Sequence, residues 1–110
     1  MFLRKKLDMN AELEEYRRLQ HANINHGAIL LDVRTPREYK AGSLPGSVNL
    51  PLNQLKSAEK VIPSFDTPVF VYCSTGARAG RAVKRLKRAG YSNIRSSGGL
   101  EGYRGEIVKG

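Results

Sequence analysis

Apolar and polar residues alternate along the chain with two periods, and these periods predict alternating helices and strands. In the first part, apolar side chains recur every three or four residues after Asn10, which suits the N-cap position, and predict a helix to about His21. A short, mainly apolar run at residues 28–33 has the length of a strand buried in a parallel sheet. Thr35 and Glu38 then form a capping-box pattern around a proline, which predicts a short helix.

The second half of the chain continues this alternation around one central strand. Residues 69–72 are all β-branched or aromatic, so they predict the clearest strand, and it leads directly into Cys73. Apolar residues at helical spacing between Ala79 and Ala89 predict a helix that ends before Gly90. Less regular segments predict a turn and a brief strand at 44–51, a short helix at 54–60, a strand at 93–96, a loop at Gly98 and Gly99, and a last short helix at 100–103.

This order of elements predicts the α/β class, as a small three-layer domain with a largely parallel central sheet flanked by helices. The chain has 110 residues, which is the size of one domain. Its apolar content of 40% and charged content of 26% are typical of a soluble globular protein. We expect residues 1–8 to form an N-terminal tail and residues 9–110 to form the domain.

The sequence predicts a cytoplasmic protein without a cofactor. No apolar run approaches the about 20 residues of a membrane span, so no membrane partner is expected, and the N-terminus lacks the apolar stretch of a secretory signal. Cys73 is the only cysteine, which excludes an internal disulfide and suits a reducing compartment. His21 and His26 are spaced unlike zinc ligands, and we expect both on the solvated surface, so no metal ion is expected.

Charge is distributed unevenly along the chain. The formal net charge is +9, yet no aspartate or glutamate occurs between residues 67 and 100, where seven lysines and arginines do occur. A field of one sign around Cys73 favours anions, which here means small inorganic anions, nucleic acid or an acidic partner.

The candidate site is Cys73, which lies between the central strand and the basic helix. Ligands of open α/β sheets bind outside the carboxyl ends of strands, and Cys73 lies at such an end. Residues 74–78 then form a turn rich in small residues, whose amides, together with those of the helix start, favour a thiolate over a thiol. A lone cysteine after an apolar strand is more commonly a buried hydrophobic residue. The combination of strand, cysteine, small-residue turn, arginine and basic helix favours a site instead.

Five short motifs follow one another along the chain. They are Asp32-Val33-Arg34, Glu38-Tyr39, the stretch from Gly42 to Pro51, the loop Cys73-Ser74-Thr75-Gly76-Ala77-Arg78, and the pair Gly98-Gly99. Each motif is weak alone, but their order and spacing are specific and resemble the rhodanese family. The resemblance extends from about Ala11 to Tyr103. Ser43 and Tyr103 depart from the family pattern, which commonly has histidine and tryptophan there.

The resemblance implies a sulfurtransferase that moves sulfane sulfur through a persulfide on Cys73. The implied donor is thiosulfate or another persulfide, and the implied acceptor is cyanide or a thiol, including that of a sulfur-relay protein. Cys73 is then the catalytic nucleophile. The substrate-binding residues implied are those of the loop, namely Ser74, Thr75, Gly76, Ala77 and Arg78.

Two side-chain roles and several functions stay open at this point. Arg78 either faces the pocket or holds the loop through backbone carbonyls, whereas Asp32 and Arg34 are interpreted as an ion pair or loop brace. A persulfide-carrying or docking module without turnover is an alternative to the enzyme. A nucleic-acid-binding domain is disfavoured because no aromatic residues are interleaved along the basic helix. A cysteine phosphatase or arsenate reductase is also disfavoured, because four residues separate Cys73 from Arg78 where the phosphatases have five.

Overall fold

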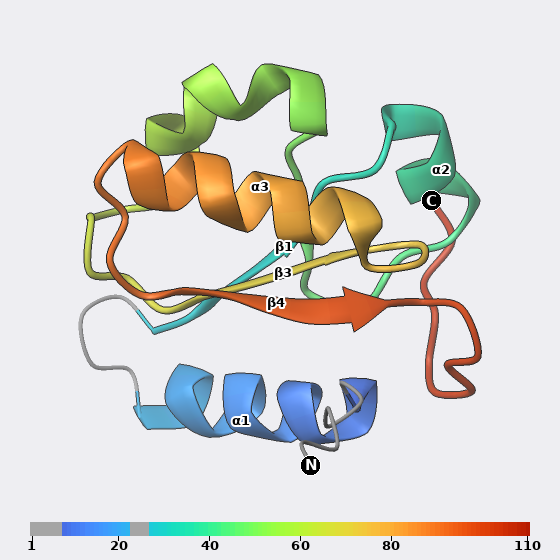
Figure 1. Cartoon of the computed structure of the whole chain (residues 1–110). Coiled ribbons are helices and arrows are strands. Elements are labelled where there is room, and N and C mark those ends of the chain that lie inside the picture. Colours follow the sequence, from blue (N-terminus) through green and yellow to red (C-terminus); the bar gives the residue numbers. More distant parts are fainter. Residues whose placement is uncertain (1–7, 23–26) are drawn as a thin grey trace, which may run out of the picture.

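The computed structural model describes residues 8–22 and 27–110 and has the predicted α/β architecture (Figure 1). Four parallel strands form one sheet in the order β2-β1-β3-β4. Helix α1 covers one face, and α3 and the 3-10 helix η2 cover the other, so the predicted three layers are confirmed. The elements are α1 (Met9–Ala22), β1 (Ile29–Asp32), α2 (Pro36–Ala41), β2 (Val48–Asn49), η2 (Leu52–Lys60), β3 (Val69–Cys73), α3 (Ala77–Arg88) and β4 (Ile94–Gly99).

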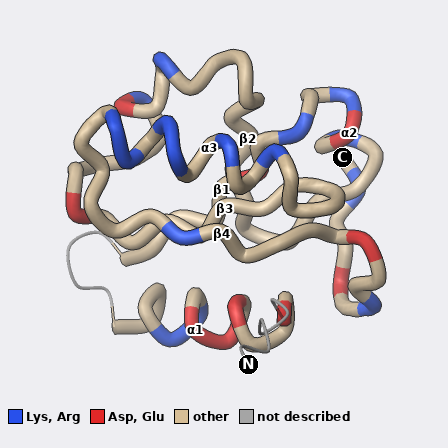
Figure 2. The backbone as a smooth tube through the Cα atoms, in the orientation of Figure 1, with Lys and Arg blue, Asp and Glu red and all other residues tan. Residues whose placement is uncertain are grey.

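The two faces of the sheet differ in charge. Helix α1 carries three glutamates and two arginines, whereas α3 carries six lysines and arginines and no acidic residue. Figure 2 shows these cationic positions following one another along α3, on the opposite side of the sheet from α1. None of the helices in the described part of the chain has the length and apolarity that a bilayer span requires.

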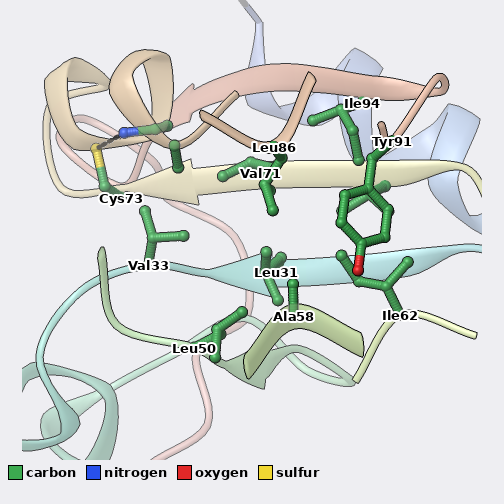
Figure 3. Close-up of a cluster of buried hydrophobic side chains, with 13 residues drawn as sticks. Leu31, Val33, Leu50, Ala58, Ile62, Val71, Cys73, Leu86, Tyr91 and Ile94 are labelled. Carbon is green, nitrogen blue, oxygen red and sulfur yellow. Dashed lines mark hydrogen bonds between the residues drawn. The ribbon is translucent and has the colours of Figure 1, made fainter. Parts of the chain in front are cut away.

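The hydrophobic core consists of one cluster on each face of the sheet. Side chains alternate along a strand, so Leu30 and Phe70 point toward α1 while Leu31 and Val71 point toward α3. The α3 cluster, shown in Figure 3, ends at Cys73. The central strand β3 is therefore buried on both faces, as its apolar sequence predicts, and it brings Cys73 to the carboxyl edge of the sheet.

Helix α1 is fixed to the sheet by a buried carboxylate. Glu12 accepts hydrogen bonds from Arg95 Nε and Nη2 of β4, at 3.0 and 2.6 Å, and from Ser97 Oγ at 2.8 Å. The helix begins one residue before Asn10, because Asp8 and not Asn10 caps it. The Asp8 carboxylate accepts the Asn10 amide at 3.0 Å, which corrects the predicted N-cap.

Four other segments differ from the prediction. The first strand is shorter than residues 28–33, and residues 52–60 form an interrupted 3-10 helix. Gly98 and Gly99, predicted as a loop, belong to β4. Residues 100–103 form a turn and not a helix, because the amides of Leu100 and Glu101 bond the carbonyls of Cys73 and Ser74, each at 2.9 Å. These two hydrogen bonds join the end of β4 to the candidate site.

Candidate active site

Cys73 lies beneath the loop that joins β3 to α3. Its side chain is fully buried, and its Sγ accepts backbone N–H groups from Gly76 at 2.9 Å and from Ala79 at 3.3 Å. Figure 3 shows this sulfur at the edge of the core cluster, directed toward the start of α3. Two amides converging on one sulfur stabilise negative charge there. The predicted position of Cys73, at a strand end facing a helix start, is therefore confirmed.

The sulfur of Cys73 also completes the N-terminus of α3. The first amides of a helix have no intrahelical acceptor, and the N-cap residue Gly76 has no side chain to supply one. Cys73 Sγ accepts the third of these amides, that of Ala79. Ala79 lies outside the loop of residues 74–78 expected to contact the sulfur. Gly76 is the sequence signal that could have indicated this contact, because a glycine at the N-cap leaves the first amides of the helix free for another acceptor.

Two close backbone approaches determine the path of the loop. Gly76 has a φ of 100°, in the left-handed region that favours glycine, so the chain reverses there into α3. On the other side of the loop, a Cβ atom at Gly99 would overlap the carbonyl group of Ser74. This contact explains why β4 ends in glycines, and it packs the end of the sheet directly against the loop.

Arg78 pairs with a glutamate from another helix. Its Nη1 and Nη2 donate to Glu38 Oε1 and Oε2 at 2.7 and 2.9 Å, and Nη2 also lies 3.2 Å from Ser74 Oγ. Ser74 Oγ in turn donates to Glu38 Oε2 at 3.2 Å. Arg78 thus braces the loop through a carboxylate and a hydroxyl, where the prediction named backbone carbonyls.

Glu38, which positions Arg78, is itself held by hydrogen bonds at the start of α2. It is the third residue of α2, and the predicted capping box with Thr35 is present, with both hydrogen bonds formed. The Arg78 guanidinium holds the pKa of the Glu38 carboxyl well below its ordinary value, an effect that burial opposes and the hydrogen bonds from Thr35 assist. Glu38 was predicted to cap α2, but its contact with the loop was missed.

Asp32 and Arg34 form the predicted ion pair. Arg34 Nη2 lies 2.8 Å from Asp32 Oδ2, and Arg34 Nε lies 3.1 Å from both carboxylate oxygens. Arg34 Nη2 also donates to the carbonyl of Gly42 at 2.6 Å, while Asn49 Nδ2 donates to the carbonyls of residues 32 and 34. The pair therefore braces the turn after β1, as predicted, and neither side chain is hydrogen-bonded to Cys73.

The remaining predicted residues lie at the surface of the loop or away from it. Thr75 and Ala77 are exposed, and Thr75 Oγ1 is 3.5 Å from the amide of Ala77. His21 is exposed as expected, while His26 lies outside the described residues. Within residues 8–22 and 27–110, no three histidine, cysteine, aspartate or glutamate side chains gather where they could hold a metal ion.

A groove begins beside the loop. It has a volume of about 390 Å³ and lies between α3, η2 and the start of α2. Arg78 borders it at the loop end, and Arg85 borders it further along α3. The candidate site is therefore a buried sulfur under an amide-rich loop, and an open groove begins beside that loop.

This arrangement defines an α/β domain with a buried cysteine under an amide-rich loop at the carboxyl edge of a parallel sheet. A family model of the rhodanese-like domain matches residues 12–106, and the chain belongs to that family. This family membership and the parallel four-stranded sheet agree with the resemblance noted in the sequence. By function, the chain therefore belongs to the rhodanese-domain sulfurtransferase family.

Individual relatives support the same assignment. The chain is 40% identical over 81 residues to the uncharacterized protein YqhL of Bacillus subtilis, covering 73% of this chain and 64% of YqhL. It is 33% identical over 81 residues to the thiosulfate sulfurtransferase PspE of Escherichia coli, covering 73% of this chain and 78% of PspE. A solved rhodanese with anions from E. coli superimposes with a TM-score of 0.71 at 32% identity, covering 76% of this chain and all of that one.

Proposed function

We propose that the chain is a thiosulfate sulfurtransferase that carries sulfane sulfur on Cys73. The observation that carries the proposal is the pair of backbone amides, from Gly76 and Ala79, that converge on the only cysteine sulfur of the chain. A persulfide places its negative charge on the sulfur beyond Sγ, where amides of the loop and of the helix start stabilise it. Family membership and the relationship to PspE support the same chemistry.

The reaction has two displacement steps. The Cys73 thiolate attacks the outer sulfur of thiosulfate, a new S–S bond forms, and the original S–S bond breaks as sulfite leaves with the electron pair. A thiol, as its thiolate, or cyanide then attacks the terminal sulfur of the persulfide, and the Cys73 thiolate leaves. The two steps return the enzyme to its starting state, as in other covalent cycles.

Each loop residue has a proposed role in this cycle. Ser74, Thr75, Gly76 and Ala77 line the approach to the sulfur and contribute amides, and Arg78 provides positive charge at the edge of the site. Because Glu38 binds both terminal nitrogens of Arg78, we assign that arginine mainly to positioning the loop. Because Cys73 is buried, we propose that the loop shifts to admit the donor. A lone cysteine also supports the proposed cytoplasmic location.

The substitution Cys73→Ser tests this proposal. We expect it to abolish thiosulfate:cyanide sulfurtransferase activity, because a serine hydroxyl neither ionises at neutral pH nor accepts sulfane sulfur in this way. Far-ultraviolet circular dichroism should stay like that of the wild type, because the change replaces one atom by a smaller one and keeps an acceptor for the loop amides. Substantial turnover by the variant would contradict the role of Cys73.

A persulfide carrier without turnover is the second candidate, and the full burial of Cys73 favours it. A carrier would take up one sulfur atom per chain from a donor and release it slowly to cyanide. Steady-state turnover of thiosulfate well above one equivalent per chain would support the enzyme, whereas a single burst without turnover would support the carrier.

A phosphatase is the weaker alternative. Four residues separate Cys73 from Arg78, so the loop forms a smaller ring than the phosphatase loop with five. In addition, the Arg78 guanidinium, which would otherwise bind a phosphoryl group, is paired with Glu38. Assays with aryl phosphates compare the two activities directly. Phosphate hydrolysis faster than sulfur transfer by the wild-type chain would replace the present proposal.

A further inference from the structure

The outer face of α3 is strongly basic and largely unpaired. Among the described residues, none of its five exposed cationic side chains beyond Arg78 forms an ion pair with a carboxylate. Side chains of one sign on one short helix repel one another, and the repulsion falls when an anionic surface covers them. The five residues are Arg81, Lys84, Arg85, Lys87 and Arg88.

A groove runs along this helix from the loop that covers Cys73. Next to the depression beside the loop lies a second one of about 270 Å³, and both are lined by Leu52, Asn53 and Arg85. We therefore treat them as one groove between η2 and α3, called here the η2–α3 groove. Its loop end is bordered by Arg78, so a chain segment lying in it reaches the end of the loop that covers Cys73.

The lining of the η2–α3 groove combines an apolar floor with cationic walls. Leu52 and Leu55 contribute partly buried apolar surface, and Lys56 and Arg85 stand exposed on opposite sides. No acidic residue lines either part of the groove, as far as the described residues show. Such a surface is complementary to a segment that carries both carboxylates and small apolar side chains.

Other occupants fit this groove less well. Single-stranded nucleic acid binds through bases stacked on aromatic side chains, and none of the described residues that line the groove is aromatic. A second copy of this chain carries the same net charge of +9, which opposes self-association.

We propose that the η2–α3 groove binds an acidic segment of the protein that exchanges sulfur with Cys73. The purpose of this docking, sulfur exchange with Cys73, rests on the proposed function. The binding itself rests on the charge and the shape of the groove. Docking in the groove holds the partner thiol or persulfide at the loop entrance and raises its effective concentration there. The groove thus selects a protein partner, while small donors such as thiosulfate reach the loop without it.

A labelled peptide tests the binding surface. The probe is a short fluorescein-labelled peptide of glutamate, leucine and serine that ends in cysteine, and its binding is followed by fluorescence anisotropy. We expect Lys56→Glu/Arg85→Glu to weaken binding by at least about ten-fold, and we expect wild-type affinity to fall as salt rises. The matched control is Arg17→Glu/Arg104→Glu, which reverses two exposed charges outside the groove and should change affinity much less.

The same variants separate docking from catalysis. At saturating thiosulfate, where a weaker attraction of the anion no longer matters, cyanide turnover by Lys56→Glu/Arg85→Glu should stay within about two-fold of wild type, while sulfur transfer to the peptide thiol should fall with the affinity. Absence of cyanide activity in the wild type would refute the proposed function and leave the binding result intact. Equal loss of peptide binding in the groove and control variants would overturn the docking proposal, as would tighter binding of oligouridylate than of the peptide.

Discussion

Two arginine–carboxylate pairs lie near the carboxyl edge of the sheet. They differ in burial and in how far apart the two partners are in the sequence. Asp32 and Arg34 are two residues apart, and their side chains are 0% and 8% exposed. Glu38 and Arg78 are forty residues apart, and their side chains are 34% and 30% exposed. The first pair closes a turn within one segment, whereas the second joins α2 to the loop over Cys73.

This difference separates a stabilising role from a positioning role. Removing one partner of a buried pair leaves an uncompensated charge away from water and strongly destabilises the fold. A partly exposed pair contributes little to the free energy of unfolding, because water and salt screen both charges. We therefore expect the Asp32–Arg34 pair to determine whether the edge folds, and the Glu38–Arg78 pair to determine where the loop lies.

The largest effect is expected from Asp32→Asn. The change keeps the shape of the side chain but leaves the buried guanidinium of Arg34 without its counter-charge. The free energy of unfolding should fall by about 3–5 kcal/mol. Urea denaturation followed by circular dichroism measures it. A loss under about 1 kcal/mol would show that the buried pair has no special structural role.

The next effect is on activity and comes from Glu38→Gln. Glutamine preserves the capping box with Thr35, so the change removes the ion pair to Arg78 and leaves α2 capped. We expect stability to change by less than about 1 kcal/mol, and kcat for sulfur transfer to fall about ten-fold, equivalent to about 1.4 kcal/mol of barrier.

The two kinetic parameters distinguish positioning from binding. A misplaced loop lowers kcat more than it raises KM for thiosulfate, whereas loss of an anion-binding charge mainly raises KM. Glu38→Asp, which keeps the charge on a shorter side chain, should recover part of kcat. Unchanged kcat in Glu38→Gln would remove the proposed link between Glu38 and the sulfur.

The smallest effect is the pH dependence of the same pair. Because the folded-state pKa of Glu38 lies below its ordinary value of 4.5, the pair stabilises the fold above pH 4.5 and loses this contribution as pH falls through the folded-state pKa. The stability difference between wild type and Glu38→Gln, below about 1 kcal/mol at pH 7, should therefore shrink at acid pH. Urea denaturation at pH 7 and pH 3 measures it, and a difference that grows on acidification would contradict the assignment.

The parts of the site that are local in sequence could be predicted from it. The strand, Cys73 and the basic helix follow one another directly, so the hydrophobic pattern alone places the sulfur at a strand end. Asp32 and Arg34 are likewise close enough in sequence to be interpreted as a pair.

The parts that depend on distant segments could not be predicted. No pattern relates Glu38 to Arg78, and none relates Glu12 of α1 to Arg95 of β4, although their side chains meet in the fold. Gly98 and Gly99 favour a loop by propensity, yet β4 includes them because they pair with Tyr72 and Cys73 of β3. The loop backbone leaves no room for a Cβ at Gly99. Tertiary packing decided each of these cases.

The most direct test of the central claim is the intact mass of the protein after exposure to thiosulfate, measured before and after addition of cyanide. The wild-type chain should gain the mass of one sulfur atom and lose it again with cyanide. Cys73→Ser should show neither change. A wild-type chain that gains no sulfur, or a Cys73→Ser variant that gains as much as the wild type, would contradict a persulfide on Cys73.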